Sequence, residues 1–170
     1  MALRQEFRAR IADHKAAGRP VIYLDESGFA VDQPHTHGYA PRGKRCFGEL
    51  DWHARGRVNV PGALLAGALL TVGLTGANVD AEIFNLWLGR DLIPKLPPGA
   101  VVVMDNASFH KRADTREMIE SAGHNLEDLP PYSPDLNPIE PKGAQAKAIR
   151  RRTGQSPNES FGQADSRIQA

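Results

Sequence analysis

The sequence has a single cysteine, no long apolar run and almost no net charge. Cys46 alone cannot form an internal disulfide or a cysteine-based zinc site, so we interpret it as a small, partly buried side chain. A membrane-spanning helix needs about 18 or more consecutive apolar residues, which the sequence lacks, and the N-terminal MALRQEFRAR has no signal-peptide core. We therefore expect a cytoplasmic protein that does not associate with membranes.

The net charge is only +1, so the overall charge does not indicate nucleic-acid binding. Basic residues are nevertheless clustered in two places. One cluster comprises Arg42, Lys44 and Arg45, and the other comprises Lys142, Lys147, Arg150, Arg151 and Arg152. Such patches suit a polyanion that approaches from one side, but basic residues near a helix C-terminus are also explained by the helix dipole. Charge alone leaves both interpretations open.

The length and composition are those of one globular domain. The chain has 170 residues, of which 41% are hydrophobic and 24% are charged. We expect residues 1–152 to form this domain. Residues 153–170 are polar and weakly periodic, and we expect them to form a poorly ordered tail.

The pattern of apolar residues predicts alternating helices and strands. Helices are expected at residues 2–17, from Asn78 or Asp80 to about 93, and at 111–122. Buried strands are expected at 21–24 and 100–104, with two more in 57–74 joined near 66–67 and a short one around Tyr39. This order of elements indicates an α/β domain with a mixed sheet flanked by helices.

The strands expected at 21–24 and 100–104 are each followed by an aspartate, Asp25 after the first and Asp105 after the second. A single aspartate at a strand end is usually a turn former or a helix cap. Two of them are a functional signal, because active sites of open α/β sheets gather at the carboxyl ends of strands.

The segment 129–140, LPPYSPDLNPIE, contains four prolines. They restrict the backbone, so we expect a stiff, largely extended arm that delivers Glu140 into the first turn of a basic helix. Asn137 as N-cap, Pro138 at the first helical position and Glu140 at the third fit a capping box. From the local pattern alone, capping is the simpler interpretation of Glu140.

The alternative is that Glu140 converges on Asp25 and Asp105. Three carboxylates at one location would raise one another's pKa, and a divalent cation removes this repulsion. Ligands that are all oxygen favour Mg²⁺ or Mn²⁺ over zinc. Two such ions can activate an attacking oxygen and stabilise a leaving oxygen in phosphoryl transfer.

Three motifs carry a resemblance to a known family. YLDESGF, VVVMDNASFHK and LPPYSPDLNPIE resemble the catalytic blocks of DDE transposases of bacterial insertion sequences, in the branch related to mariner elements. Residues 106–139, 34 in all, separate Asp105 from Glu140, which is also typical of that branch. The stretches RGRVNVPGALL and DAEIFNLWLGRDLIPKLP are similar to the family too, so the resemblance extends from about Ile22 to Arg152.

The resemblance implies a ribonuclease H-like fold, an α/β domain whose central five-stranded mixed sheet is flanked by helices. It also implies a Mg-dependent enzyme in which Asp25, Asp105 and Glu140 bind two Mg²⁺ (or Mn²⁺) ions. Such an enzyme cuts DNA at transposon ends and joins the freed 3′ hydroxyl to target DNA. A homodimer associated with the bacterial nucleoid is expected by the same analogy, because transposition handles two ends.

The resemblance gives roles to further residues. Asn106 and His110 are expected near the site or the scissile phosphate, although His110 fits a cap or packing residue of the next helix equally well. Phosphate contacts, which give affinity but no sequence specificity, are expected from Arg42, Lys44, Arg45, Lys142 and Lys147. We interpret His35, His37 and His53 as exposed loop residues, and Trp52 and Trp87 as packing residues.

The sequence departs from the family pattern in two respects. It has no recognisable helix-turn-helix region, so we expect a separate polypeptide to recognise the DNA ends. Gly143 stands where relatives commonly carry tryptophan, three residues after the glutamate, and a missing buried tryptophan could cost roughly 3–5 kcal/mol. The alternative to an active enzyme is therefore a catalytically impaired remnant that acts as a DNA-binding or dimerisation module.

Overall fold

The computed structural model describes residues 2–30, 39–47, 56–76, 79–105, 113–156 and 159. One sheet has the strand order β3-β2-β1-β4-β5. Its strands are β1 (Val21–Ala30), β2 (Arg57–Leu65), β3 (Ala68–Val72), β4 (Val101–Met104) and β5 (Asn125–Asp128). The first three strands pair antiparallel, and β4 and β5 run parallel to β1. This mixed five-stranded sheet confirms the expected ribonuclease H-like fold.

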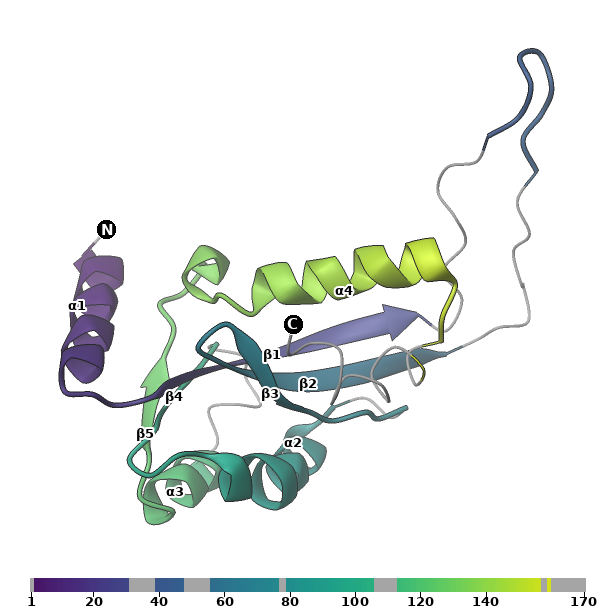
Figure 1. Cartoon of the computed structure of the whole chain (residues 1–170). Coiled ribbons are helices and arrows are strands. Elements are labelled where there is room, and N and C mark those ends of the chain that lie inside the picture. Colours follow the sequence, from purple (N-terminus) through teal and green to yellow (C-terminus); the bar gives the residue numbers. More distant parts are fainter. Residues whose placement is uncertain are drawn as a thin grey trace.

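Helices cover both faces of the sheet (Figure 1). On one face lie α1 (Ala2–Ala16) and α4 (Glu140–Thr153). On the other lie α3 (Ala113–Ser121) and α2 (Ala81–Trp87), which continues through a π-helical turn, η1 (Leu88–Leu92), and a 3-10 turn, η2 (Ile93–Lys95). Among the described residues, no helix is both long and apolar enough to cross a membrane.

The side chains of β1 alternate between the two faces, as the two-residue period of a strand requires. Ile22 and Leu24 are buried in the main core, together with residues of α2, η1 and α3. Val21 packs in a second cluster with Phe7 and Ile11 of α1. The odd-numbered residues of β1, which include Asp25, therefore face the side of the sheet that carries α1 and α4.

Several predicted boundaries are confirmed. Ala66 and Gly67 join β2 to β3, and both have positive φ (51° and 85°), as a tight hairpin turn requires. Asp80 caps α2, since its Oδ1 accepts from the backbone N–H groups of Glu82 and Ile83 at 3.0 and 2.9 Å. Trp87, 5% exposed, is a core residue as predicted.

The prediction that the first strand ends at Leu24 is wrong, because β1 continues to Ala30 and Asp25 lies inside it. The polar sequence DESG resembles a turn, yet its backbone pairs with β2 throughout, from Asp25 opposite Gly62 to Gly28 opposite Asn59. Phe29, only 1% exposed, then anchors the far end of the strand. Pairing and burial thus override the local turn signal.

The proline segment is not the extended arm that was predicted. The backbone turns at Tyr132, whose φ is +53°, and then forms a 3-10 turn, η3 (Pro134–Leu136). Arg4 of α1 holds this shape, because Nη1 donates to Ser133 Oγ at 3.3 Å and Nη2 pairs with Asp135. The segment is thus fixed against α1 by side-chain contacts as well as by its prolines.

Two predictions within residues 39–47 are also wrong. These residues, which we call the basic turn, extend away from the sheet (Figure 1), and they form no strand around Tyr39. Cys46 is exposed and not partly buried, because the basic turn has no core to pack against. Of the predicted tail, the structure describes the end of α4, residues 154–156 and residue 159.

Candidate active site

The two aspartates become neighbours through the register of the parallel strands. Val21 pairs with Val101 and Tyr23 with Val103. Continuing this register by two residues places Asp105, which directly follows β4, beside Asp25 of β1. Because both lie an even number of residues from these pairs, both belong to the face that carries α1 and α4.

Glu140 reaches the same face as the first residue of α4. The capping-box interpretation of this residue is wrong, because α4 begins at Glu140 and not at Pro138. The backbone N–H of Asn137, which a capping box would direct to Glu140, donates instead to the carbonyl of Pro134 at 2.9 Å. Glu140 and Asp105 are both exposed, so a substrate can reach them.

The electrostatics of Asp25 show that the three carboxylates interact. Burial, the charge of Glu140 and, more weakly, the charge of Asp105 raise the pKa of Asp25 from 3.8 to about 6. The backbone N–H of Glu26 and the charge of Lys147 act in the opposite direction. Asp25 is thus a carboxylate whose ionised form the surrounding protein disfavours.

The chemistry of these three groups fits a divalent cation. All the ligand atoms are oxygen, as Mg²⁺ and Mn²⁺ prefer, and a cation would relieve the repulsion that raises the pKa of Asp25. Within the described part of the chain, however, no three His, Cys, Asp or Glu side chains lie close enough to form a ready-made metal site. The carboxylates would therefore have to draw together to share an ion.

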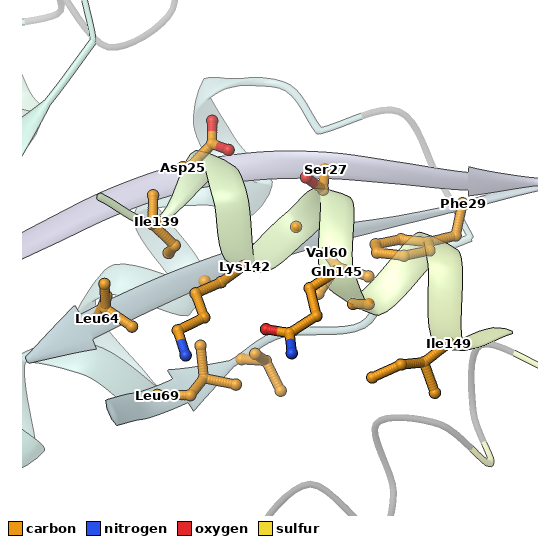
Figure 2. Close-up of a pocket in the computed structure, with 14 residues that line it drawn as sticks. Asp25, Ser27, Phe29, Val60, Leu64, Leu69, Ile139, Lys142, Gln145 and Ile149 are labelled. Atoms are coloured by element: carbon orange, nitrogen blue, oxygen red, sulfur yellow. The ribbon is translucent and has the colours of Figure 1, made fainter. Parts of the chain in front are cut away.

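A cavity of about 190 Å³ lies next to Asp25, between α4 and the first three strands (Figure 2). Its walls are mostly apolar, with Leu64 and Leu69 on the sheet and Ile139 and Ile149 near the two ends of α4. In Figure 2 the carboxylate of Asp25 points away from the two leucines. An apolar space thus borders the carboxylate on one side.

Gly143 allows α4 to approach β1 closely at this point. A Cβ atom added to Gly143 would lie 2.8 Å from Ser27 Oγ, closer than carbon and oxygen normally approach. The sequence indicated only the cost of a missing tryptophan at this position. The close approach is a positive role for this residue, and the loss of stability from the missing tryptophan stays a prediction.

The other predicted site residues are more scattered. Arg42, Lys44 and Arg45 are exposed on the basic turn, which extends away from the sheet (Figure 1). On α4, Lys142 lines the cavity and Lys147 Nζ lies 5.5 Å from the centre of the Phe29 ring. Asn106, His110, His35, His37, His53 and Trp52 lie outside the described residues.

Arg150 has a structural role that the sequence did not indicate, because there it was only one member of a basic cluster. Arg150 is only 3% exposed. Its Nη2 donates to the carbonyl of Ala30 at 3.0 Å and its Nε to that of Gln155 at 3.0 Å, so it ties α4 to the end of β1. Spacing could have indicated this, since Gly143, Ala146 and Arg150 follow one another at three and four residues, on one face of a helix.

A protein-family model described as "DDE superfamily endonuclease" matches residues 20–160 of the chain. Among curated proteins, none matches the sequence.

Solved structures of Mos1 transposase share the fold. A Mos1 paired-end complex with the left transposon end aligns with a TM-score of 0.72 and 18% identity, over 98% of this chain and 53% of that chain. A Mos1 mariner paired-end complex with Mn aligns with a TM-score of 0.67 and 17% identity, over 98% of this chain and 54% of that chain. The catalytic domain of Mos1 mariner transposase aligns with a TM-score of 0.63 and 14% identity, over 99% of this chain and 80% of that chain. The chain spans about half the length of the Mos1 chains in the two complexes.

Proposed function

Because the chain belongs to the DDE superfamily endonucleases, we propose that it is the catalytic domain of a transposase. It cleaves DNA strands at transposon ends and joins the freed end to target DNA. The observation that carries the proposal is that three carboxylates share one face of the sheet. The register of β1 and β4 brings Asp105 next to Asp25, and the charge of Glu140 helps to raise the pKa of Asp25. Because the three motifs resemble those of the mariner-related branch of bacterial insertion-sequence transposases, we assign the enzyme to that branch and its catalytic domain to residues 1–152.

In this proposal Asp25, Asp105 and Glu140 hold two Mg²⁺ or Mn²⁺ ions. When bound, a pair of such ions supplies Lewis-acid activation of the attacking and leaving oxygens in phosphoryl transfer. The protein contributes the placement of the carboxylates, two from the sheet and one from α4. Mos1 paired-end complexes with Mn and with Mg, which have similar structures, support the choice of metal.

DNA is the proposed partner, because similar Mos1 structures are complexes with transposon ends. The basic turn supplies three positive charges through Arg42, Lys44 and Arg45, and α4 supplies two through Lys142 and Lys147. Contacts of this kind provide affinity that depends on salt and not on base sequence. We assign Asn106 and His110 to the neighbourhood of the scissile phosphate on the resemblance alone.

Two further assignments concern assembly and location. We assign recognition of specific ends to a helix-turn-helix region outside residues 1–170. Two transposon ends must be handled together, so the working unit is a homodimer. Its site of action is the bacterial nucleoid.

The test is a strand-cleavage assay with Mg²⁺ or Mn²⁺, on supercoiled plasmid and on a duplex that carries the terminal sequence of the source element. The parent chain is compared with Asp105→Ala, Glu140→Ala and the control Glu120→Ala, which removes an exposed acid of α3 on the opposite face. Cleavage by the parent and the control, but by neither site variant, is the expected result.

Cleavage that survives Asp105→Ala and Glu140→Ala would rule out this site. A folded parent that binds Mn²⁺ and DNA without cleaving either substrate would favour the catalytically impaired remnant. Two observations support the impaired remnant as a second candidate: glycine occupies position 143, and a cavity of about 190 Å³ adjoins it.

A further inference from the structure

Asn137 occupies an unusual position between two of the proposed catalytic acids. Its side chain is almost fully enclosed, with 3% of the residue exposed. Nδ2 donates to the carbonyl oxygen of Leu24 at 2.9 Å, and Oδ1 accepts from the backbone N–H of Ile139 at 3.3 Å. Leu24 directly precedes Asp25, and Ile139 directly precedes Glu140.

We propose that Asn137 is a positioning residue that sets the backbone of Glu140 relative to the backbone of Asp25. The inference rests on the proposed function of these acids. One side-chain amide has both a donor and an acceptor, and here each end bonds to the backbone of the residue that precedes one of the two acids. A shift of α4 along β1 would break one or both hydrogen bonds.

Backbone hydrogen bonds hold Asn137 itself in place at the start of α4. The backbone N–H of Asn137 donates to Pro134 at 2.9 Å, and its carbonyl accepts from the N–H of Glu140 at 3.3 Å. Ile139 is 5% exposed and lines the cavity beside Asp25. Asn137 therefore fixes a short, buried stretch of chain and does not merely cap an exposed turn.

The two hydrogen bonds can be separated by substitution. Asn137→Ala removes both. Asn137→Asp keeps an acceptor for the N–H of Ile139 but loses the donor to Leu24. A carboxylate oxygen then faces the carbonyl oxygen of Leu24, so two acceptors meet in a buried place. Because the link to Leu24 is the one that reaches β1, Asn137→Asp should be as harmful to positioning as Asn137→Ala.

Asn85→Ala is the matched control. Asn85 Oδ1 accepts from the Thr115 hydroxyl at 2.7 Å, which joins α2 to α3 on the opposite face of the sheet. This substitution removes a partly buried asparagine that links two elements, as Asn137→Ala does, but it leaves the three acids untouched. It therefore reports the effect of lost stability alone.

The first measurement is the affinity of the purified chain for Mn²⁺, by titration calorimetry, below the unfolding temperature of every variant. Substitution of residues that orient metal ligands typically lowers affinity 10–100-fold. We expect a loss of about this size in Asn137→Ala and Asn137→Asp, and affinity within about twofold of the parent in Asn85→Ala. Parent-like affinity in both Asn137 variants, or an equal loss in Asn85→Ala, would overturn the proposal.

The second measurement is backbone amide hydrogen exchange, which needs no metal. The Ile139 and Glu140 amides should exchange at least about tenfold faster in Asn137→Ala than in Asn85→Ala, because their local structure opens without global unfolding. If the parent fails to bind Mn²⁺, the proposed function has failed, and exchange alone decides the positioning role. Unchanged exchange at these two amides would overturn that role.

Discussion

Asp25→Asn is expected to stabilise the folded chain at neutral pH and to have little effect in acid. Burial, reinforced by the charges of Glu140 and Asp105, raises the pKa of Asp25 from 3.8 to about 6. In the unfolded chain this carboxyl ionises near its ordinary value, so above pH 6 the folded protein carries a carboxylate that it disfavours. The contribution of Asp25 to stability is therefore fully present below pH 3.8 and is lost as the pH rises through about 6.

The size of the effect follows from the two pKa values. The difference between 3.8 and about 6 corresponds to about 3 kcal/mol, at about 1.4 kcal/mol for each pH unit. Asp25 retains partial exposure, and solvent screens its interactions, so we expect Asp25→Asn to raise the free energy of unfolding by about 1–2 kcal/mol. An amide at this position carries no charge and removes the repulsion at every pH.

The assay is urea denaturation of parent and variant in the presence of EDTA, at about pH 7.5 and at about pH 4. The control is Asp135→Asn, because the hydrogen bond from Arg4 lowers the pKa of Asp135 and the sign is reversed. That variant should lose stability at both pH values, because the favourable charge of Asp135 is lost only as the pH falls below 3.8. An Asp25→Asn variant that is destabilised, or equally stabilised at both pH values, would refute the reasoning.

Three other expectations concern packing and charge. Ala146→Leu should partly fill the cavity beside α4 and raise the free energy of unfolding by about 1 kcal/mol, and a lower value would contradict the packing described. Arg150→Met should lower the free energy of unfolding by about 2–4 kcal/mol, because two charge-assisted hydrogen bonds are lost. Arg151→Met, at an exposed position, should change it little, and equal effects of the two substitutions would argue against the buried link of Arg150. Replacing the three basic residues of the basic turn with alanine should reduce the slope of log affinity against log salt for duplex DNA by up to about 3, and an unchanged slope would remove this turn from the DNA interface.

The sequence was sufficient to predict the elements that carry the acids, but it predicted their local geometry incompletely. The strand of Val101 to Met104 and the helices flanking it follow from apolar periodicity, because burial alone decides them. The extension of β1 through Asp25 did not follow. A polar run is compatible with a strand only when a partner such as β2 pairs with it along its whole length, and pairing is a nonlocal property.

Side-chain contacts between distant segments were the hardest features to predict. Asn137 has the local pattern of a helix N-cap, and only the structure shows that its amide reaches Leu24, 113 residues away. The burial of Arg150 depends in the same way on contact with Ala30. Local pattern limits what such side chains can do, whereas the tertiary structure decides which of those options is used.

The parallel register of β1 and β4 has a consequence for how this chain tolerates insertions and deletions. Hydrogen bonding between the strands, and not the number of residues between them, sets the separation of Asp25 and Asp105. Residues in the segments that connect the elements between β1 and β4 can therefore be added or lost without moving the pair, as long as β2, β3 and α2 are kept. A slip of the register by one residue, in contrast, would carry one aspartate to the opposite face. Glu140 has no such protection, because its position depends on a short connecting segment whose length and anchor points must both be kept.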